Sequence, residues 1–225
     1  MSINATAGYK AVLEITGQPM AMTEEPLTNT GDNQTFVVTN LLRDVWAFTS
    51  PLTVQTSPDG STWTTITTGF TVQYLVGTVR LNTPQAGIQV RVTGEFLPRY
   101  TFALARSVDF EDSVAELDVT TFGDDYVRRI YGLADVSGSI QSLSVMNDEI
   151  GEDEKTLREL MGDREFVVLS YRPDEDNSFV QRAVIMFSTR SLSMSVDDVQ
   201  TASIDFVGAN PRVLGGPQIG TEYRN

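Results

Sequence analysis

The strongest constraint on the fold of this chain is a long succession of short segments rich in Val, Ile, Thr and aromatic residues, separated by turn residues. Segments of this composition form β-strands. In the second half, from Arg99 to Arg212, the expected order is strand, turn, strand, one helix, strand and hairpin. The sequence therefore predicts a mainly β chain with a single helix.

The first half of the chain contains seven candidate strands, which are Ala11–Thr16, Thr35–Thr39, Leu52–Thr56, Thr64–Thr67, Phe70–Val76, Thr78–Leu81 and Ile88–Thr93. The segment from Ser57 to Gly60, Ser-Pro-Asp-Gly, predicts a tight turn, because Pro fixes φ, Asp bonds its own backbone and Gly accepts a positive φ. The two-residue period of the last strand predicts that Ile88, Val90 and Val92 share a buried face.

The second half contains strand candidates Thr101–Phe110, Leu117–Thr121, Ala134–Val145, Phe166–Tyr171, Phe179–Phe187, Ser191–Val196 and Thr201–Val207. The alternation slips between Ile140 and Leu143, which predicts a bulge. The apolar run Phe166–Tyr171 predicts a strand covered on both faces. A helix is expected from Asn147 or Asp148 to Gly162, with acidic residues at its start and Gly at its end.

The segment from Leu97 to Tyr100 is the candidate domain boundary, since Pro98 interrupts the pattern and the charge density rises after it. We predict a β-rich domain over residues 1–98 and a second domain over residues 99–225 that ends in a C-terminal arm. The acidic residues are concentrated in the second domain. Residues 1–98 carry 4 basic and 7 acidic side chains, and residues 99–225 carry 12 basic and 23 acidic ones.

The composition removes several classes of chemistry. The 225 residues include no Cys and no His, so disulfides, thiolate or imidazole metal sites and His-dependent triads are excluded. No apolar run is long enough to span a membrane, and the N-terminus lacks the pattern of a signal peptide. The net charge of −14 disfavours tight binding to nucleic acid.

Two acidic groupings have alternative interpretations. The loop Asp174–Ser178 is either a calcium loop or a solvated hairpin tip, and it has Phe179 and Ile185 where the EF-hand pattern needs Gly and Glu. The carboxylate pairs are either a hydrolase site or solvated turns. They are Glu111 with Asp112, Asp124 with Asp125, and Asp197 with Asp198.

The aromatic residues of the first half form either a sugar-binding platform or part of the core. They are Trp46, Trp63, Phe70 and Tyr74. The basic doublet Arg128-Arg129 is interpreted as an ion-pair donor within or between subunits. No phosphate-binding loop or dinucleotide fingerprint is present, so no cofactor is expected.

The ordered landmarks of the second half resemble the tail tube (major tail) proteins of long-tailed, non-contractile bacteriophages, the siphophage type. Residues 118–125 resemble the acidic segment before the large loop of that family, and residues 132–140 resemble the strand after it. Residues 156–162 stand where the lone helix of the family lies. Residues 179–208 resemble the closing strands with their short acidic turn.

The resemblance implies a β-sandwich tail-tube domain with one short flanking α-helix and no enzymatic activity. It implies copies of the chain assembled as stacked hexameric rings, whose inner wall is a β-barrel with an acidic lumen through which double-stranded DNA passes without sticking. It also implies a virion tail location after synthesis in the host cytoplasm, partners that include the tape measure, tail tip and terminator proteins, and no membrane insertion.

Two groups of candidate site residues follow from that resemblance. The candidates for the lumen wall are Asp205, Ser203, Thr201, Asp135, Ser137 and Ser139. The candidates for contacts between rings or subunits are Glu111, Asp112, Asp124, Asp125, Arg128 and Arg129. Residues 1–98 are expected to decorate the exterior or to elaborate the tube wall. The alternative function is a carbohydrate-binding or adhesive β-domain protein of a virion or cell surface, and a third class is a carboxylate-based hydrolase.

Overall fold

The computed structural model describes residues 12–101, 105–121, 126, 129–143, 166–172, 179–193, 201–209, 211–212 and 222–224. Over these residues the regular secondary structure is β-strand apart from one 3-10 helix, η2 (Leu41–Arg43). The prediction of a mainly β chain is confirmed. The expected helix from Asn147 to Gly162, the candidate calcium loop Asp174–Ser178 and the pair Asp197 and Asp198 lie outside the described residues.

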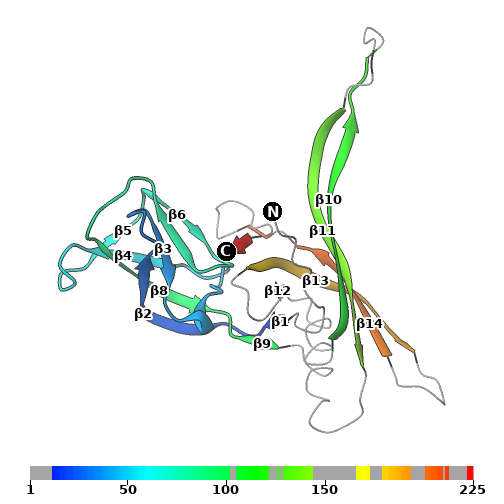
Figure 1. The fold of residues 1–225 in the computed structure, drawn as a ribbon, viewed down its shortest axis with the longest axis horizontal. Coiled ribbons are helices and arrows are strands. Elements are labelled where there is room, and N and C mark those ends of the chain that lie inside the picture. The colour runs from blue at the N-terminus through cyan, green and yellow to red at the C-terminus, as the bar shows by residue number, and fades with distance from the viewer. Residues whose placement is uncertain are drawn as a thin grey trace, which may run out of the picture. The chain divides into compact units, whose positions relative to one another are not determined.

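The described strands form two sheets (Figure 1). In chain order the strands are β1 (Val12–Thr16), β2 (Met20–Asn29), β3 (Thr35–Val38), β4 (Thr53–Ser57), β5 (Thr64–Ile66), β6 (Phe70–Gln73), β7 (Thr78–Leu81), β8 (Gln89–Phe96), β9 (Arg99–Thr101), β10 (Ala105–Asp118), β11 (Arg129–Leu143), β12 (Val167–Arg172), β13 (Val180–Ser193), β14 (Thr201–Gly208) and β15 (Glu222–Arg224). The larger sheet has the order β10-β11-β14-β13-β12-β1-β9, with β15 paired to β13. The smaller sheet has the order β5-β4-β8-β2-β3-β7-β6.

The chain divides into two compact units. The first comprises Met1–Thr101, Val168–Ala183 and Asn210–Asn225, and the second comprises Phe102–Val167 and Val184–Ala209. The predicted domains, 1–98 and 99–225, are each continuous in the sequence, whereas these units are interleaved. The interleaving arises because β1 pairs with β12, a pairing between residues more than 150 positions apart that no local pattern reveals.

In the order of the chain, the strands of the smaller sheet come between β1 and β9, which are neighbours in the larger sheet. Strands β1 and β9 are antiparallel partners, with Thr16 opposite Arg99, and the N–H of Gly17 donates to the carbonyl of Pro98 at 2.9 Å. The chain therefore leaves the larger sheet after β1, builds all seven strands of the smaller sheet, and returns next to its point of departure. Strand β1, which the sequence prediction placed in the N-terminal domain, belongs to the larger sheet.

The smaller sheet encloses its own hydrophobic core, which includes Phe36, Trp46, Val79, Val90 and Val92. Val90 and Val92 are buried and Ile88 packs against them, so the predicted shared face is confirmed. The predicted turn from Ser57 to Gly60 is also confirmed. Asp59 accepts hydrogen bonds from the N–H groups of Ser61 and Thr62 at 2.9 and 2.8 Å, and Gly60 has a φ of +74°.

Strand β2 was missed by the sequence analysis. Its ten residues, Met-Ala-Met-Thr-Glu-Glu-Pro-Leu-Thr-Asn, contain two Glu and a Pro, which are uncommon in strands. Pairing with β8 on one side and β3 on the other overrides these local preferences. The burial of Met22 and Leu27 places the strand across the core.

Two predicted strands of the second half are one. β10 runs without interruption over 14 residues, whereas the prediction ended a strand at Phe110 and began another at Leu117. The polar stretch between the two predicted strands pairs with β11 and so remains a strand. Charged side chains are common in edge strands. The expected bulge is opposite Gln141 and Ser142, but the extra residue lies in β10, between Ala105 and Ser107.

Strand β12 is covered on both faces, as predicted from its apolar run. Val167, Val168, Leu169 and Ser170 are all buried, although only alternate residues would be buried in a strand with one wet face. The alternation predicted for β14 is confirmed where side chains are described, since Ile204 and Phe206 are buried and Asp205 is exposed.

Candidate functional site

The second unit presents one acidic face of a four-stranded sheet made of β10, β11, β14 and β13. Asp109 lies opposite Ser139, Ser139 opposite Asp205, and Asp205 opposite Thr189, so one row crosses all four strands. In the neighbouring rows Glu111 lies opposite Ser137, and Ser113 lies opposite Asp135. Facing residues of paired strands have side chains on the same side of the sheet. We call this side the acidic face. Its carboxylates are Asp109, Glu111, Asp135 and Asp205.

The acidic face is solvent-accessible, and its counterpart is mostly apolar, with Arg190 in the row of Ile204. The four carboxylates are exposed, while Ile140 and Ile204 on the opposite side are buried. Phe110 and Phe206 meet edge to face there, with ring centroids 5.3 Å apart. They pack across Gly138, where an added Cβ would lie 2.5 Å from the Phe206 ring and 2.0 Å from the Asp109 carbonyl oxygen. Only glycine fits this contact, so Gly138 allows the aromatic pair to close the core.

The residues predicted for the lumen wall are brought together by the strand register. Asp135, Ser137 and Ser139 of β11 and Ser203 and Asp205 of β14 share the acidic face. Thr201 occupies the matching position at the start of β14, opposite Leu143, and its side chain lies outside the described residues. That this face lines a lumen remains a prediction.

The sequence analysis missed the contribution of β10 to the acidic face. Asp109 was not a candidate, and Glu111 was a candidate for subunit contacts only. The signal was present in the alternation of Ser107, Asp109 and Glu111 with Val108 and Phe110, which the prediction recorded as a strand without assigning its wet side.

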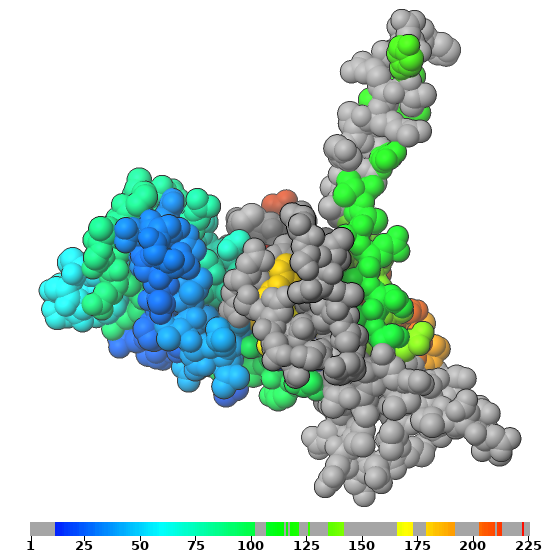
Figure 2. All heavy atoms as spheres, in the orientation of Figure 1, coloured from blue at the N-terminus to red at the C-terminus, as the bar shows by residue number. Residues whose placement is uncertain are grey.

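Strands β10 and β11 continue past the four-stranded region as a two-stranded hairpin (Figure 1). Strand β14 pairs with β11 only from Ser137 to Leu143, so Arg129–Val136 pairs with β10 alone among the described strands. In Figure 2 the side chains of β10, drawn in green, lie at the surface along this hairpin. Its apolar residues are open to solvent, with Val114 51% and Tyr126 85% exposed. A two-stranded ribbon has little stability by itself.

Of the predicted contact residues that are described, Glu111 lies at the end of the four-stranded region, and Asp112 and Arg129 lie on this hairpin. Glu111 and Asp112 are adjacent and exposed, and the register directs them to opposite faces, which removes them as a carboxylate pair across a cleft. Arg129 begins β11 opposite Asp118. Asp124, Asp125 and Arg128 lie outside the described residues. Their role in contacts between subunits remains a prediction.

Of the two interpretations of the first-half aromatics, the core is confirmed for Trp46. This side chain is 0% exposed, and its Nε1–H donates to the Arg43 carbonyl oxygen at 3.0 Å. Phe70 and Tyr74 are partly buried and pack against the same core. The ring of Trp46 fills the core of the smaller sheet, as large aromatic residues commonly do in β-domains. Trp63 is partly buried as well, but it is not one of the residues that pack against that core.

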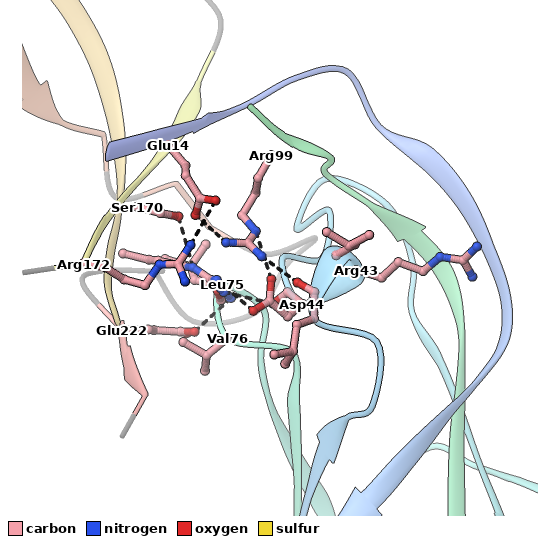
Figure 3. Close-up of polar contacts among 12 residues, drawn as sticks. Glu14, Arg43, Asp44, Leu75, Val76, Arg99, Ser170, Arg172 and Glu222 are labelled. Carbon is pink, nitrogen blue, oxygen red and sulfur yellow. Dashed lines mark hydrogen bonds and ion pairs between the residues drawn. The ribbon is translucent and has the colours of Figure 1, made fainter. Parts of the chain in front are cut away.

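The first unit contains a buried ion cluster that the sequence analysis did not find (Figure 3). Its members are Glu14, Asp44, Arg99, Arg172, Arg182 and Glu222. Arg182 and Asp44 are both 0% exposed and join at 2.8 Å between Nη2 and Oδ2. The Arg182 guanidinium also donates to the carbonyl oxygen of Leu75 at 2.5 Å and to Ser170 Oγ at 3.1 Å. One side chain thereby satisfies acceptors from three separate segments.

The remaining members of the cluster surround this pair. Arg99 joins Glu14 through Nη1, and its Nε lies 3.2 Å from Asp44 Oδ1. Arg172 joins the other oxygen of Glu14 at 3.2 Å. The cluster connects β1, β9, β12 and β13 to the segments around Asp44 and Leu75 that belong to the inserted part of the chain. Arg182 lies in the apolar stretch of β13, but an Arg in a strand is ordinarily exposed, so the sequence did not predict its burial.

Glu222 of β15 closes the cluster from the C-terminal side. Its carboxylate accepts a hydrogen bond from the Leu75 N–H at 2.9 Å, and Arg182 is opposite it in the strand register. Burial raises the pKa of Glu222 from 4.5 to about 7, although the Leu75 N–H and Arg182 act in the other direction. The protonated form of Glu222 is therefore the form that the folded state favours up to neutral pH.

This raised pKa predicts a stability change with pH. Since the folded pKa exceeds the unfolded one, the contribution of Glu222 is fully present below pH 4.5 and is lost as pH rises through about 7. The loss amounts to about 3 kcal/mol. Glu222→Gln retains an acceptor for Leu75 and should gain stability relative to the natural chain by that amount between pH 5 and pH 8. Urea unfolding of both chains measures this difference, and a constant difference across the range contradicts the assignment.

Two negative observations apply to the part of the chain that the structure describes. No three Asp or Glu side chains there gather closely enough to hold a metal ion. No helix there is long and apolar enough to cross a membrane.

The chain is similar to solved structures but matches no family model and no curated protein. A chain in the virion of a native gene transfer agent particle is 14% identical, with 56% of this chain and 89% of that chain covered and a TM-score of 0.44. A chain in the tail of an empty gene transfer agent particle, solved with C6 symmetry, is 15% identical, with 56% and 87% covered and a TM-score of 0.41. Because both TM-scores are below 0.5, we argue function from the residues of this chain.

Proposed function

We propose that this protein is a non-enzymatic structural subunit of a bacteriophage tail tube of the siphophage type, which assembles as stacked hexameric rings around an acidic lumen. The observation that carries the proposal is the acidic face of the second unit, bordered by the long edge strand β10. The proposal also rests on the order of the sequence landmarks in residues 99–212, which resembles that of tail tube proteins.

The edge of β10 provides a way to assemble. Its 14 residues pair only with β11 among the described strands, so β10 is an edge strand of the described part of the larger sheet. Edge strands of this length pair readily with other chains. When each copy pairs its edge with the next copy in the same sense, the contact is head to tail, and it closes into a ring if the rotation allows. A closed ring of sheets is a barrel without free edges.

The charge of the acidic face suits a wall along which DNA moves. Four carboxylates are presented by each copy, and none of the residues in the rows that contain them is Arg or Lys. Phosphates are repelled by such a wall over roughly 8 Å at physiological ionic strength. Double-stranded DNA therefore passes without binding. The tape measure protein would occupy the same lumen before DNA does, and the tail tip and terminator proteins would meet the ends of the tube.

Negative-stain electron microscopy of the concentrated full chain tests the assembly. We expect rings or tubes of uniform diameter, formed with or without tail-tip initiator proteins. Dispersed monomers under both conditions would reject the tube and favour the alternative of an adhesive β-domain protein.

Reversing one charge on the acidic face tests the lumen. Asp205→Lys should leave tube formation unchanged, because Asp205 lies away from the buried side of the sheet, and should slow genome ejection from assembled particles. Ser203→Ala on the same face is the matched neutral control and should eject DNA at the natural rate. Equal ejection rates for all three particles would remove Asp205 from the wall.

A further inference from the structure

The smaller sheet presents an outward face on β5, β4 and β8 that gathers planar polar side chains around one aromatic ring. Thr65, Gln55 and Arg91 lie in one row across the three strands. The neighbouring row, which includes Val54 and Val92, faces the buried core instead. Trp63 precedes Thr65 by two residues, on the outward side, and is partly exposed.

These side chains hold each other in fixed orientations. The Arg91 guanidinium lies over the Trp63 ring, 4.1 Å from its centroid. Arg91 Nε donates to Gln55 Oε1 at 2.8 Å, and Gln55 Nε2 donates to Thr65 Oγ1 at 3.2 Å. A stacked cation and two amide contacts restrict the rotamers of the group, so little ordering remains to be done when a ligand binds.

Glu24 reaches this group by an unusual backbone conformation. Its φ is +53°, a value that is uncommon for residues other than glycine, and it lies where the β2–β8 register shifts between Met22 and Glu25. The Glu24 N–H donates to Thr93 Oγ1 at 3.0 Å, and its carboxylate joins Arg91 at 2.9 Å while the side chain stays 56% exposed. Backbone strain of this kind is concentrated at functional sites.

We propose that Trp63, Arg91, Gln55, Thr65 and Glu24 form a binding platform for an uncharged hexose oligosaccharide. The C–H groups of a sugar ring pack on an indole, and the amide, carboxylate and hydroxyl groups around it match the donors and acceptors of vicinal sugar hydroxyls. Arg91, whose side chain is 16% exposed, holds the indole and the Gln55 amide in place. Arg91 is neutralised by Glu24, and the chain carries a net charge of −14, so acidic glycans are repelled.

The platform is a sheet surface, so it contacts few sugar units. A single copy of the protein therefore binds an oligosaccharide weakly, with a Kd of about 1 mM. Where the proposed tube exists, many copies of the platform face the same polysaccharide, and avidity raises retention by about 100-fold or more over the single chain. This second step rests on the proposed function, whereas the platform itself does not.

Titration of the full chain with maltohexaose, cellohexaose and mannohexaose tests the platform. The chain has two Trp residues and Trp46 is fully buried, so a change in tryptophan fluorescence on binding reports Trp63. Ligand-observed NMR measures the variants. We expect binding of at least one oligosaccharide, weakened about tenfold or more by Trp63→Ala and by Gln55→Ala, and retained within about threefold by Trp63→Phe. Arg80→Gln, an exposed change on β7, should bind as the natural chain does.

The outcomes separate the two proposals. No binding to any of the three oligosaccharides, or binding that Trp63→Ala and Gln55→Ala both leave unchanged, overturns the platform. Since Trp63→Ala could unfold the sheet, Gln55→Ala with an unchanged melting temperature decides in that case. A third outcome is that the protein binds an oligosaccharide but that concentrated protein is retained no better on the matching immobilised polysaccharide. This outcome counts against the tube and leaves the platform in place.

Discussion

Replacing Arg182 by Met should destabilise the first unit by about 3–5 kcal/mol, because it removes the guanidinium that a buried carboxylate and buried carbonyl oxygens share. Asp44 is 0% exposed and would lose its 2.8 Å partner, while the Leu75 carbonyl oxygen would lose its 2.5 Å donor. Met retains most of the volume of the Arg stem, so the effect reports lost polar contacts more than a cavity. Urea unfolding, followed by the fluorescence of the core residue Trp46, measures it.

Three further variants make this result interpretable. Arg182→Lys retains the charge but not the five donors, and should fall between Met and the natural residue. Arg80→Met, on an exposed surface, should change stability by less than about 0.5 kcal/mol. Adding Asp44→Asn to Arg182→Met removes the charge of that carboxylate and should recover part of the loss. If Arg182→Met costs less than about 1 kcal/mol, the cluster does not hold the unit together.

The strands of the first half of the chain illustrate what local patterns predict. The seven predicted segments of the first half match seven described strands within about two or three residues, because Val, Ile and Thr runs end at marked turns such as Ser57 to Gly60. Strand β2 was missed because its Glu and Pro residues argue against a strand and its partners β3 and β8 are distant in the sequence.

Partner choice could not be predicted at all. Strand β1 alternates like the strands that follow it, yet it pairs with β9 and β12 in the other sheet. Nothing in Val12–Thr16 distinguishes these partners from β2 or β3, since the choice depends on packing across the whole chain. The ion cluster was hidden for the same reason, because its charges come from segments far apart and each looks solvated in isolation.

The candidate site was predicted in part for a physical reason. The six lumen candidates lie on β11 and β14, where Ser and Asp alternate with apolar residues, and register aligns the two strands. Asp109 on β10 follows the same alternation. It was missed because the prediction assigned no wet side to the segment Thr101–Phe110.

The extended hairpin has the properties of an assembly element. Among the described strands only β10 and β11 continue beyond Glu111 and Ser137, and Val114 and Tyr126 are exposed on this ribbon. Apolar side chains on a ribbon that is marginally stable alone are buried most readily against another copy. The acidic residues that accompany them, such as Asp112 and Glu116, keep the free subunit soluble before assembly.

Shortening the hairpin should therefore abolish tube formation while leaving the subunit folded. Replacing residues 115–133 by Asn-Gly joins Val114 to Ala134, which are already paired, through a favoured two-residue turn. Pairing of β11 with β14 begins at Ser137 and is not touched, so the melting temperature should change by less than about 5 °C. Sedimentation and electron microscopy should find monomers at concentrations where the natural chain forms tubes.

The matched control, Tyr126→Ser in the full-length hairpin, should raise the concentration needed for assembly without abolishing it, since it removes one side chain of the contact. Tubes of normal length from the shortened chain would exclude the hairpin from the contacts between subunits and leave the edge of β10 as the element that joins them.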